Sequence, residues 1–454
     1  MTTARQVAAD VLDLARARKH YASELVDDQL SKTKLMPQDR RFVTQLVMGV
    51  VRRKATLDAI LTPFVTRPPH AVEPRLWDIL QLGAFQLVFL THVPKHAAVH
   101  ESVELATYIG NAKAKGFLNG VLRRVSELVT DEFVDYGWMN TVPFEQGKTG
   151  PSYRKLNRDV LPNPEENFPE YLSAAFSWPR WLAEHWLEIR DEAACVRLGF
   201  WFNAPPPLWL RINKRKCDRE SYRLSLAAAT IDAEPGEHPQ SLKLLDNASV
   251  RDLPGYDDGD FTVQDISAMA VATAMNVSPG MRVLDLCSAP GGKTTHLSEL
   301  MQNRGTIVAC DVDAKRLETV TALCARLGAT NVETHLIAEN GQPPEGPFHA
   351  ALVDVPCSNT GVLGRRPEVR WRLRPEELPH LIRLQTKLLF QAIERVKPGG
   401  TIVYSTCSIE PDENSGVVNA VRRGIRDLTL EAEHHSIPGQ PGDGSYWARL
   451  RKPI

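Results

Sequence analysis

The sequence predicts an α/β protein with a doubly wound, Rossmann-like parallel sheet in its C-terminal part, preceded by a helical domain and a small α+β module. Near the C-terminus, four short apolar runs alternate with amphipathic helical stretches, which is typical of parallel strands joined by helices. The first part of the chain carries apolar residues at helical spacing almost throughout. The middle part mixes short strand and helix signals.

The bulk composition indicates a soluble globular protein of several domains. The chain has 454 residues, of which 43% are hydrophobic and 24% charged, and its net charge is −1. The sequence contains no apolar run of the ~18 residues that cross a bilayer, and its N-terminus lacks an apolar signal core. We therefore expect a cytoplasmic monomer with no membrane partner. A net charge near zero does not exclude nucleic acid, because local patches matter more than the sum.

Residues 1–130 predict a compact helical bundle. Val7, Val11 and Leu14 recur at helical spacing, as do Leu76 and Leu80. The basic residues of this region are expected to share one face: Arg52, Arg53, Lys54, Arg123 and Arg124.

Three further segments follow. Residues 131–169 are rich in Pro, Gly, Asn and charge, so we expect a linker or irregular insertion there. Residues 170–260 predict the small α+β module, in which tryptophans such as Trp178 and Trp186 pack in a core. Residues 261–454 form the predicted doubly wound domain, with strands at "RVLDLC", "TIVACD", "HAALVDV" and "TIVYST".

The turn after the first of these strands indicates a nucleoside cofactor. A phosphate-binding loop of the form G-x-x-x-x-G-K-[ST] would need glycine where this chain has Cys287, which weighs against an ATP or GTP hydrolase. Gly291 and Gly292 allow close approach of a ligand, and the helix that follows suits a carboxylate. "TIVACD" ends in Asp311, which could accept hydrogen bonds from ribose hydroxyls. S-adenosylmethionine and NAD both fit, and the missing G-x-G-x-x-G spacing weakens NAD.

Two cysteines stand just after two other strands. The chain has seven cysteines at scattered spacing and no CxxC pair, so we expect neither a metal site nor a disulfide framework. Cys357 and Cys407 each lie in a turn, and Asp354 ends the strand before Cys357. A thiolate that adds to carbon 6 of cytosine makes carbon 5 nucleophilic toward an electrophilic methyl group. A nearby carboxyl group would disperse the charge that develops on the ring.

At these residues the chain resembles the RNA 5-methylcytosine methyltransferase family. The resemblance rests on "VQDISAMA", "CSAPGGKTTHL", "DVPCSNTGVLGRRPEVRW" and "STCSIEPDENSGVV", in the family's order. "PPPLWLRIN" resembles the start of the family's small RNA-binding module. "DRRFVTQLVMGVVRRKATLDAIL" and "KGFLNGVLRRV" are similar to a NusB-like RNA-binding domain. The combination is similar to the RsmB/Sun type, which acts on small-subunit (16S) ribosomal RNA.

The resemblance implies roles for individual residues. Cys407 would be the nucleophile, Cys357 would assist release of the product, and Asp354 would contact both cytosine and cofactor. The implied S-adenosylmethionine contacts are Cys287, Ser288, Ala289, Pro290, Gly291, Gly292, Lys293, Asp311, Glu339 and Asp354. Arg365, Arg366 and Arg370 would meet RNA phosphates. Glu339 replaces the aspartate that the family usually places near the adenine.

Two other functions remain open at this point. The first is a transfer-RNA cytosine-C5 methyltransferase, because only the NusB-like region argues for the ribosomal target. The second is a non-catalytic RNA-binding assembly factor on an inherited methyltransferase fold, although the cofactor turn and both cysteines are present.

Overall fold

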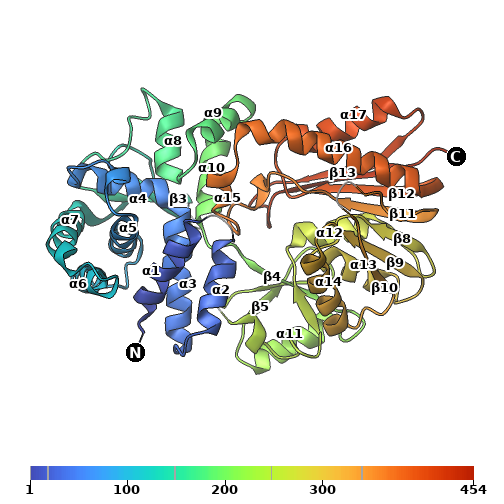
Figure 1. Cartoon of the computed structure of the whole chain (residues 1–454), viewed down its shortest axis with the longest axis horizontal. Helices are drawn as coiled ribbons and strands as arrows, with labels where there is room; N and C mark the ends of the chain where they lie inside the picture. Colours follow the sequence, from blue (N-terminus) through green and yellow to red (C-terminus); the bar gives the residue numbers. More distant parts are fainter. Residues whose placement is uncertain (1, 18–19, 148–149, 247, 339–340) are drawn as a thin grey trace. The chain divides into compact units, whose positions relative to one another are not determined.

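The computed structural model describes residues 2–17, 20–147, 150–246, 248–338 and 341–454, and the chain forms two compact units. The first unit contains Met1–Pro206 and Leu363–Leu373, and the second contains Pro207–Val362 and Arg374–Ile454. Figure 1 colours the chain from blue at the N-terminus to red at the C-terminus. None of the described helices has the length and apolar character that a membrane span requires.

The first unit begins with the predicted helical bundle. Its helices are α1 (Ala4–Ala15), α2 (Ala22–Ser31), α3 (Pro37–Arg52), α4 (Lys54–Leu61), α5 (Pro74–Phe89), α6 (Lys95–Tyr108) and α7 (Lys115–Leu128), with 3-10 turns at Thr62–Phe64, Pro69–Ala71 and Ala112–Ala114. Thr3 starts α1 with a capping box, and prolines open α3 and α5 at the position where the missing N–H costs least. The helical prediction for this region is confirmed.

The basic residues of the bundle do not form a single exposed face. Lys54, Arg123 and Arg124 are exposed, as expected. Arg52 and Arg53 are buried, and the Arg53 guanidinium donates to the carbonyl oxygens of Pro143 and Phe144 at 2.5 and 3.0 Å. Arg52 donates to the carbonyl oxygen of Gly364 at 3.0 Å. The predicted face is therefore wrong for these two arginines, because backbone carbonyl groups far along the chain accept their hydrogen bonds.

Three strands cover part of residues 131–169, so the prediction of irregular structure is wrong for them, whereas the assignment as a linker or insertion stays a prediction. Strands β1 (Val129–Val134), β2 (Thr141–Gly147) and β3 (Gly150–Leu156) form an antiparallel sheet in the order β1-β3-β2. Arg154 of β3 is buried, and its guanidinium donates to the carbonyl oxygen of Val88 at 2.9 Å, which attaches the sheet to the bundle. The strands are short and mostly polar, so they lack the alternation that identifies a half-buried strand in sequence.

The rest of the first unit is helical. It contains α8 (Phe168–Phe176), α9 (Arg180–Ile189), α10 (Glu192–Asn203) and the short α15 (Val369–Arg372). Trp178 and Trp186 are fully buried with ring centroids 4.8 Å apart, which confirms the prediction that they are packing aromatics.

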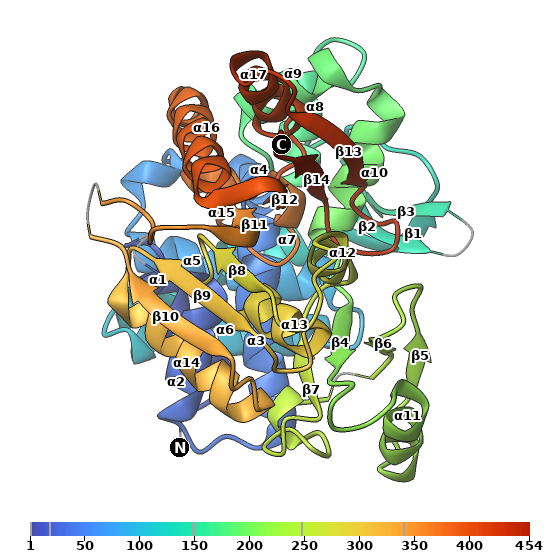
Figure 2. The same cartoon turned by 90° about the vertical axis from the view of Figure 1, so that its right-hand side faces the viewer.

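The second unit opens with a small antiparallel sheet in the order β5-β6-β4-β7. Its elements are β4 (Leu208–Ile212), α11 (Arg219–Ala228), β5 (Ala233–Pro235), β6 (Ser241–Leu244), a 3-10 turn at Val250–Asp252 and β7 (Phe261–Val263). Tyr222 and Leu226 of α11 join Leu210 and Leu242 of the sheet in one apolar core. Figure 2 shows α11 beside this sheet at the lower right.

A seven-stranded sheet, in the order β10-β9-β8-β11-β12-β14-β13, forms the centre of the second unit. In chain order its elements are α12 (Ile266–Ala274), β8 (Arg282–Asp285), α13 (Gly292–Leu300), β9 (Thr306–Asp311), α14 (Ala314–Leu327), β10 (Val332–Leu336), β11 (Phe348–Asp354), a 3-10 turn at Thr360–Val362, another at Pro375–Glu377, α16 (Leu378–Arg395), β12 (Val396–Thr406), the π-helical turn η7 (Asp412–Gly416), α17 (Val417–Gly424), β13 (Thr429–Ser436) and β14 (Ser445–Arg451). Helices α16 and α17 cover one face, and α12, α13 and α14 cover the other (Figure 1). The predicted doubly wound fold is confirmed.

The order of the strands fixes where a ligand can bind. The chain runs outward from β8 through β9 to β10, and then returns to place β11 on the other side of β8. The carboxyl ends of β8 and β11 therefore flank the topological switch point, where open α/β sheets bind their ligands. Parallel pairing of β11 with β12 brings Asp354 opposite Ser405.

Candidate functional site

The turn after β8 is bound to the neighbouring strand. The backbone N–H and the hydroxyl of Ser288 both donate to the carbonyl oxygen of Cys310 in β9, at 2.8 and 3.0 Å. Gly291 has φ +102°, and a Cβ atom there would lie 3.2 Å from the Cα of Val320. This position thus requires glycine on both conformational and steric grounds. The turn brings residues 287–293 to the same edge of the sheet as Asp311.

Helix α13 starts at this turn and leads away from the switch point. Its N-cap is Gly291, which offers no side-chain acceptor to the first turn of the helix. The N–H groups there can bind an anion, and the helix dipole favours a carboxylate at this position.

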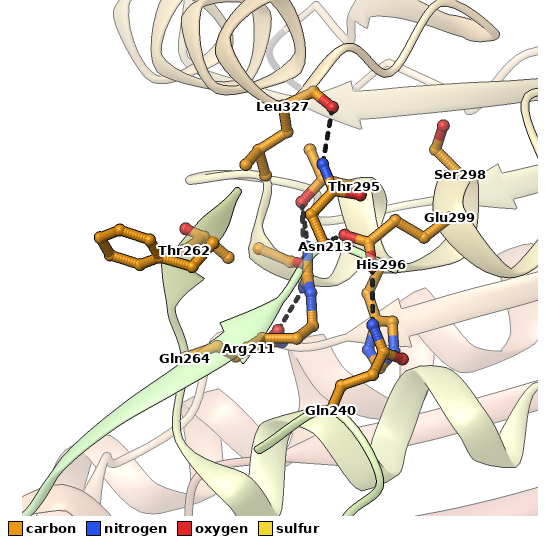
Figure 3. Close-up of polar contacts among 12 residues, drawn as sticks. Arg211, Asn213, Gln240, Thr262, Gln264, Thr295, His296, Ser298, Glu299 and Leu327 are labelled. Atoms are coloured by element: carbon orange, nitrogen blue, oxygen red, sulfur yellow. Dashed lines mark hydrogen bonds and ion pairs between the residues drawn. The ribbon is translucent and has the colours of Figure 1, made fainter. Parts of the chain in front are cut away.

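A buried arginine from the small sheet fixes the start of α13. Arg211 of β4 is fully buried, and its guanidinium donates to the carbonyl oxygen of Gly292 at 2.6 Å. A second bond, of 2.7 Å, goes to the carboxylate of Glu299 (Figure 3). The guanidinium also donates to the hydroxyl of Thr295 at 3.0 Å and to the side-chain oxygen of Gln264. One side chain therefore joins the small sheet to both ends of α13.

The second oxygen of Glu299 extends this network. It accepts a hydrogen bond of 2.8 Å from Gln240, whose amide oxygen lies 3.0 Å from Nε2 of His296 (Figure 3). Burial lowers the pKa of His296 well below its ordinary value, so this ring is neutral and serves packing and hydrogen bonding. The network holds α13, and with it the turn before the helix, in place.

Two buried carboxylates flank the turn. Asp311 ends β9 and accepts a hydrogen bond of 3.1 Å from the backbone N–H of Asp313. Asp285 ends β8 and accepts one of 2.6 Å from Thr294, while its Oδ1 atom has no hydrogen-bond partner within the described ranges. Burial raises the pKa of Asp285 to about 7. Three features together fit a cofactor that carries hydroxyl, amino and carboxylate groups. They are the buried Oδ1 atom of Asp285, the close approach that the glycines of the turn allow, and the backbone N–H groups at the start of α13.

Asp354 links the cofactor turn to the next two strands. Its Oδ2 atom lies 2.6 Å from Nζ of Lys293, and its Oδ1 atom accepts a hydrogen bond of 2.7 Å from the hydroxyl of Ser405. Burial alone would lower the pKa of Lys293, but the Asp354 carboxylate and the neighbouring Cys407 raise it above its ordinary value. Lys293 is therefore a cation at this edge.

The two predicted cysteines meet beside Asp354. Their Sγ atoms lie 3.2 Å apart, and the Cys407 thiol also lies 3.2 Å from Oδ1 of Asn359. Asn359 takes a left-handed conformation with φ +60°, and its amide donates to the carbonyl oxygen of Cys357 at 2.7 Å. Cys357 is buried, whereas Cys407 is partly exposed, so Cys407 is the thiol that a substrate can reach.

The hydrogen bond with Cys407 and burial raise the pKa of Cys357 well above its ordinary value. Burial and the nearby carboxylates of Asp285, Asp354 and Asp311 raise the pKa of Cys287 well above its ordinary value.

The three predicted RNA-binding arginines belong to the first unit, and one prediction is wrong. Arg370 is fully buried, so it cannot contact RNA phosphates. Its guanidinium donates to Asn203 Oδ1 and to the backbone carbonyl oxygens of Arg52, Phe176, Ser177, Phe202 and Leu363. Arg365 and Arg366 are partly exposed, and their role stays a prediction. Glu339, the expected adenine contact, lies outside the described residues.

Sequence reasoning missed several residues of this site. Asn359 stands inside a motif that the sequence already singles out, but a local pattern does not show that its side chain turns toward Cys407. Asp285 and Arg211 stand among apolar residues in strands, so their side chains could be expected to be buried. A buried polar side chain indicates either a functional site or a network of hydrogen bonds.

Family models match three parts of the chain. The model "16S rRNA methyltransferase RsmB/F" matches residues 272–443, "NusB family" matches 2–127, and "Methyltr_RsmF/B-like, ferredoxin-like domain" matches 178–251. A relative from Synechocystis sp., named probable ribosomal RNA small subunit methyltransferase B, is 38% identical over the full length of both chains. The chain belongs to the RsmB/F methyltransferase family.

Other members of the RsmB/F family agree with this assignment. Ribosomal RNA small subunit methyltransferase B of Escherichia coli K12 is 31% identical over 92% of each chain. The probable methyltransferase B of Bacillus subtilis is 30% identical over 92% of this chain and 88% of its own.

Solved structures agree in fold. The crystal structure of PH0851 superposes with a TM-score of 0.79 at 22% identity, over 100% of this chain and 99% of that one. NSun6 from Pyrococcus horikoshii, solved with SFG, gives a TM-score of 0.55 at 19% identity over 61% of this chain and 98% of its own. The predictions of an RNA methyltransferase of this family and of S-adenosylmethionine as its cofactor are confirmed.

The predicted domain bounds stay predictions. Residues 170–206 belong to the first compact unit, whereas the ferredoxin-like family model begins at residue 178. The described ranges hold no group of three or more side chains arranged to bind a metal ion.

Arg370→Met is expected to destabilise this RsmB/F protein rather than weaken its RNA binding directly. The change leaves buried carbonyl groups without donors, so we expect the free energy of unfolding to fall by about 3 kcal/mol. Denaturant unfolding measures this, and Arg123→Met, at an exposed position of α7, is the control that should change stability little. If Arg370→Met leaves stability unchanged but makes RNA binding weaker and less dependent on salt, Arg370 contacts RNA phosphates after all.

Asp285→Asn is expected to alter how stability depends on pH in the cofactor-free protein. The folded state keeps a proton on Asp285 up to a pKa of about 7, whereas the ordinary value is 3.8. The stability that this group contributes is therefore complete below the unfolded pKa and is lost as pH rises through about 7. From about pH 5.5 to about pH 8, the wild type should lose about 2 kcal/mol relative to the variant. Parallel stability–pH curves for the two proteins would contradict this.

Proposed function

We propose that this protein transfers a methyl group from S-adenosylmethionine to carbon 5 of a cytosine in 16S ribosomal RNA, with Cys407 as the nucleophile. The observation that carries the proposal is the pair of thiols 3.2 Å apart at the carboxyl ends of β11 and β12. Lys293 and Asp354 lie at the same edge and provide charged contacts for a base and a cofactor.

The first step forms a bond between the Sγ atom of Cys407 and carbon 6 of the cytosine. Cys407 reacts as a thiolate, whose proton has left to solvent, and the electron pair of the ring double bond moves toward carbon 5. Asp354 accepts a hydrogen bond from the exocyclic amine and holds the ring in position. The base must leave its stack to reach Cys407, which favours single-stranded or loop RNA as substrate.

S-adenosylmethionine would supply an electrophilic methyl group, which carbon 5 attacks as the bond between that methyl group and the cofactor sulfur breaks. Within the chain, residues 287–293 would line the cofactor, Asp311 would accept hydrogen bonds from the ribose hydroxyls, and Asp354 would lie toward the methionine end. Arg365 and Arg366 contact RNA phosphates.

The last step releases the product. Cys357, once its own thiol proton has left to solvent, accepts the proton of carbon 5 as a thiolate, the ring double bond re-forms, and the bond between carbon 6 and Cys407 breaks to regenerate the Cys407 thiolate. Proton transfer by a positioned side chain of this kind contributes about 10²–10⁴-fold to a rate. The buried position of Cys357 beside the nucleophile supports this role.

The names of the full-length relatives and the NusB match support the ribosomal target. We further propose that the protein acts as a monomer in the cytoplasm, with domains at 1–130, 170–260 and 261–454. Transfer RNA is the alternative substrate. A non-catalytic assembly factor is the remaining alternative, and it is disfavoured because the thiol pair and the cofactor turn are both intact.

Cys357→Ala is expected to accumulate a covalent complex between protein and RNA. Methyl transfer still occurs in this variant, but removal of the carbon 5 proton slows, so the adduct persists through denaturing electrophoresis. The double variant Cys357→Ala/Cys407→Ala is the matched control and should form no adduct. An adduct that survives in the double variant would exclude Cys407 as the nucleophile.

Bisulfite sequencing of RNA from a strain that lacks the protein is expected to reveal one lost 5-methylcytosine in 16S ribosomal RNA and none in transfer RNA. Complementation with the wild type should restore it, whereas Cys407→Ala should not. Loss of methylation in transfer RNA alone would favour the alternative substrate, and no change in either RNA would favour the assembly factor.

A further inference from the structure

Glu413 is a buried carboxylate that contacts both cysteine loops. It lies in the π-helical turn η7, which follows the Thr-Cys loop, and its side chain is fully buried. Its own backbone is held in turn, because the hydroxyl of Tyr404 donates to the Glu413 carbonyl oxygen at 2.5 Å. The reaction proposed above gives this residue no task.

Four donors surround the Glu413 side chain. Its Oε1 atom accepts hydrogen bonds from the backbone N–H of Ser358 at 2.9 Å and from the amide of Gln385 at 2.8 Å. Its Oε2 atom accepts from the hydroxyls of Ser358 and Ser408, the latter at 2.5 Å. Four donors on two oxygens match the acceptor capacity of an ionised carboxylate. Buried hydrogen bonds to a charged group are stronger than those between neutral groups.

These contacts join the two loops at the residues next to the two thiols. Ser358 directly follows Cys357, and Ser408 directly follows Cys407. The two serine hydroxyls also lie 3.0 Å from each other. A further backbone bond of 3.0 Å runs from the N–H of Gly361 to the carbonyl oxygen of Cys407. Since β11 and β12 end before these loops begin, the sheet alone does not fix the distance between the sulfur atoms.

We propose that Glu413 is a positioning residue that clamps Ser358 to Ser408, and thereby holds the thiol of Cys357 against that of Cys407 for the release step. This role rests on the proposed function, because it assigns Cys357 to product release. Glu413 acts through the two loops and does not contact the substrate.

The surrounding charges support the same assignment. Cys407 faces Lys293, whereas Glu413 adds a negative charge near Cys357 and helps to raise the pKa of that thiol, after the hydrogen bond with Cys407 and burial. The clamp therefore places the two sulfurs side by side in unequal electrostatic surroundings.

A bridging arsenical tests the geometry without using the methylation reaction. Phenylarsine oxide condenses with two adjacent thiols to form two arsenic–sulfur bonds, and its oxygen leaves as water with the two thiol protons. We expect the wild type to be bridged between Cys357 and Cys407, as peptide mass mapping would show. Glu413→Ala should lose this bridge. Glu413→Gln should keep it, because its amide can donate to the two serine hydroxyls while its oxygen accepts the two N–H bonds.

The same variants are then tested with RNA. Misplacement of a reacting group by about 1 Å costs about a hundredfold in rate, so Glu413→Ala should slow turnover by about that factor and accumulate the covalent RNA complex. Glu413→Gln should restore turnover to within about threefold of the wild type, a change that corresponds to less than about 1 kcal/mol. Affinity for S-adenosylmethionine should stay unchanged in both variants, because neither touches the cofactor turn.

Glu299→Ala is the matched control for the loss of a buried carboxylate. Glu299 is also buried in the second unit, but its contacts are to Arg211 and Gln240 and not to the cysteine loops. This variant should lose stability and still form the arsenical bridge. If Glu413→Ala fails to fold, the double variant Ser358→Ala/Ser408→Ala removes both hydroxyl arms of the clamp and should also lose the bridge.

The outcomes separate this inference from the proposed function. The positioning role is overturned if folded Glu413→Ala keeps both the arsenical bridge and normal turnover. It is also overturned if this variant keeps the bridge but loses turnover, or loses the bridge but keeps normal turnover. If the wild type makes no 5-methylcytosine and Cys357→Ala gives no adduct, the proposed function fails. A Glu413-dependent bridge would then still establish the clamp, but its assignment to product release would fall.

Discussion

The ion pair between Lys293 and Asp354 is the contact on which the site depends. Lys293 lies in the first turn of α13, which follows β8, Asp354 ends β11, and Ser405 at the end of β12 binds the second Asp354 oxygen. Three neighbouring strand ends are therefore joined through one carboxylate. The register that pairs Asp354 with Ser405 places the loops of both cysteines directly beyond this point. The pair thus adds a side-chain link between the cofactor turn and the thiols to the backbone pairing of β8, β11 and β12.

Much of this arrangement follows from the sequence. Alternation of apolar strands with amphipathic helices predicts the doubly wound sheet, and the switch-point rule then predicts that Gly291, Asp354 and Cys407 meet at one edge. The short polar strands at 129–156 could not be predicted from the sequence, because their stability comes from attachment to the helical bundle. The sequence also could not show that Glu413 contacts two loops, since its partners Ser358 and Gln385 stand 55 and 28 residues away.

The positions of basic residues in the sequence were the least reliable guide to which side chains are exposed. Arg370 was expected to meet RNA phosphates, and Arg211 stands in a segment with several other basic residues, yet both are fully buried. Each guanidinium presents five donors in a fixed fork, so one buried arginine can satisfy acceptors from several segments at once. Arg211 uses this property to fix the start of the cofactor helix, and Arg370 uses it to close the first unit around residues 363–373. The sequence shows the charge but not the carbonyl groups that surround it.

The closeness of the two sulfurs also sets the order in which they act. Two thiolates 3.2 Å apart would repel strongly, and the hydrogen bond with Cys407 and burial raise the pKa of Cys357, so Cys357 keeps its proton before the adduct forms. In the proposed reaction the sulfur of Cys407 becomes a neutral thioether when it bonds to carbon 6. The hydrogen bond and charge that raise the pKa of Cys357 then disappear, and only burial and Glu413 still oppose its ionisation. The pKa of Cys357 therefore falls once the adduct forms, so its thiol can lose its proton to solvent and be present as the thiolate that removes the carbon 5 proton. The adduct itself thus prepares the second thiol for release.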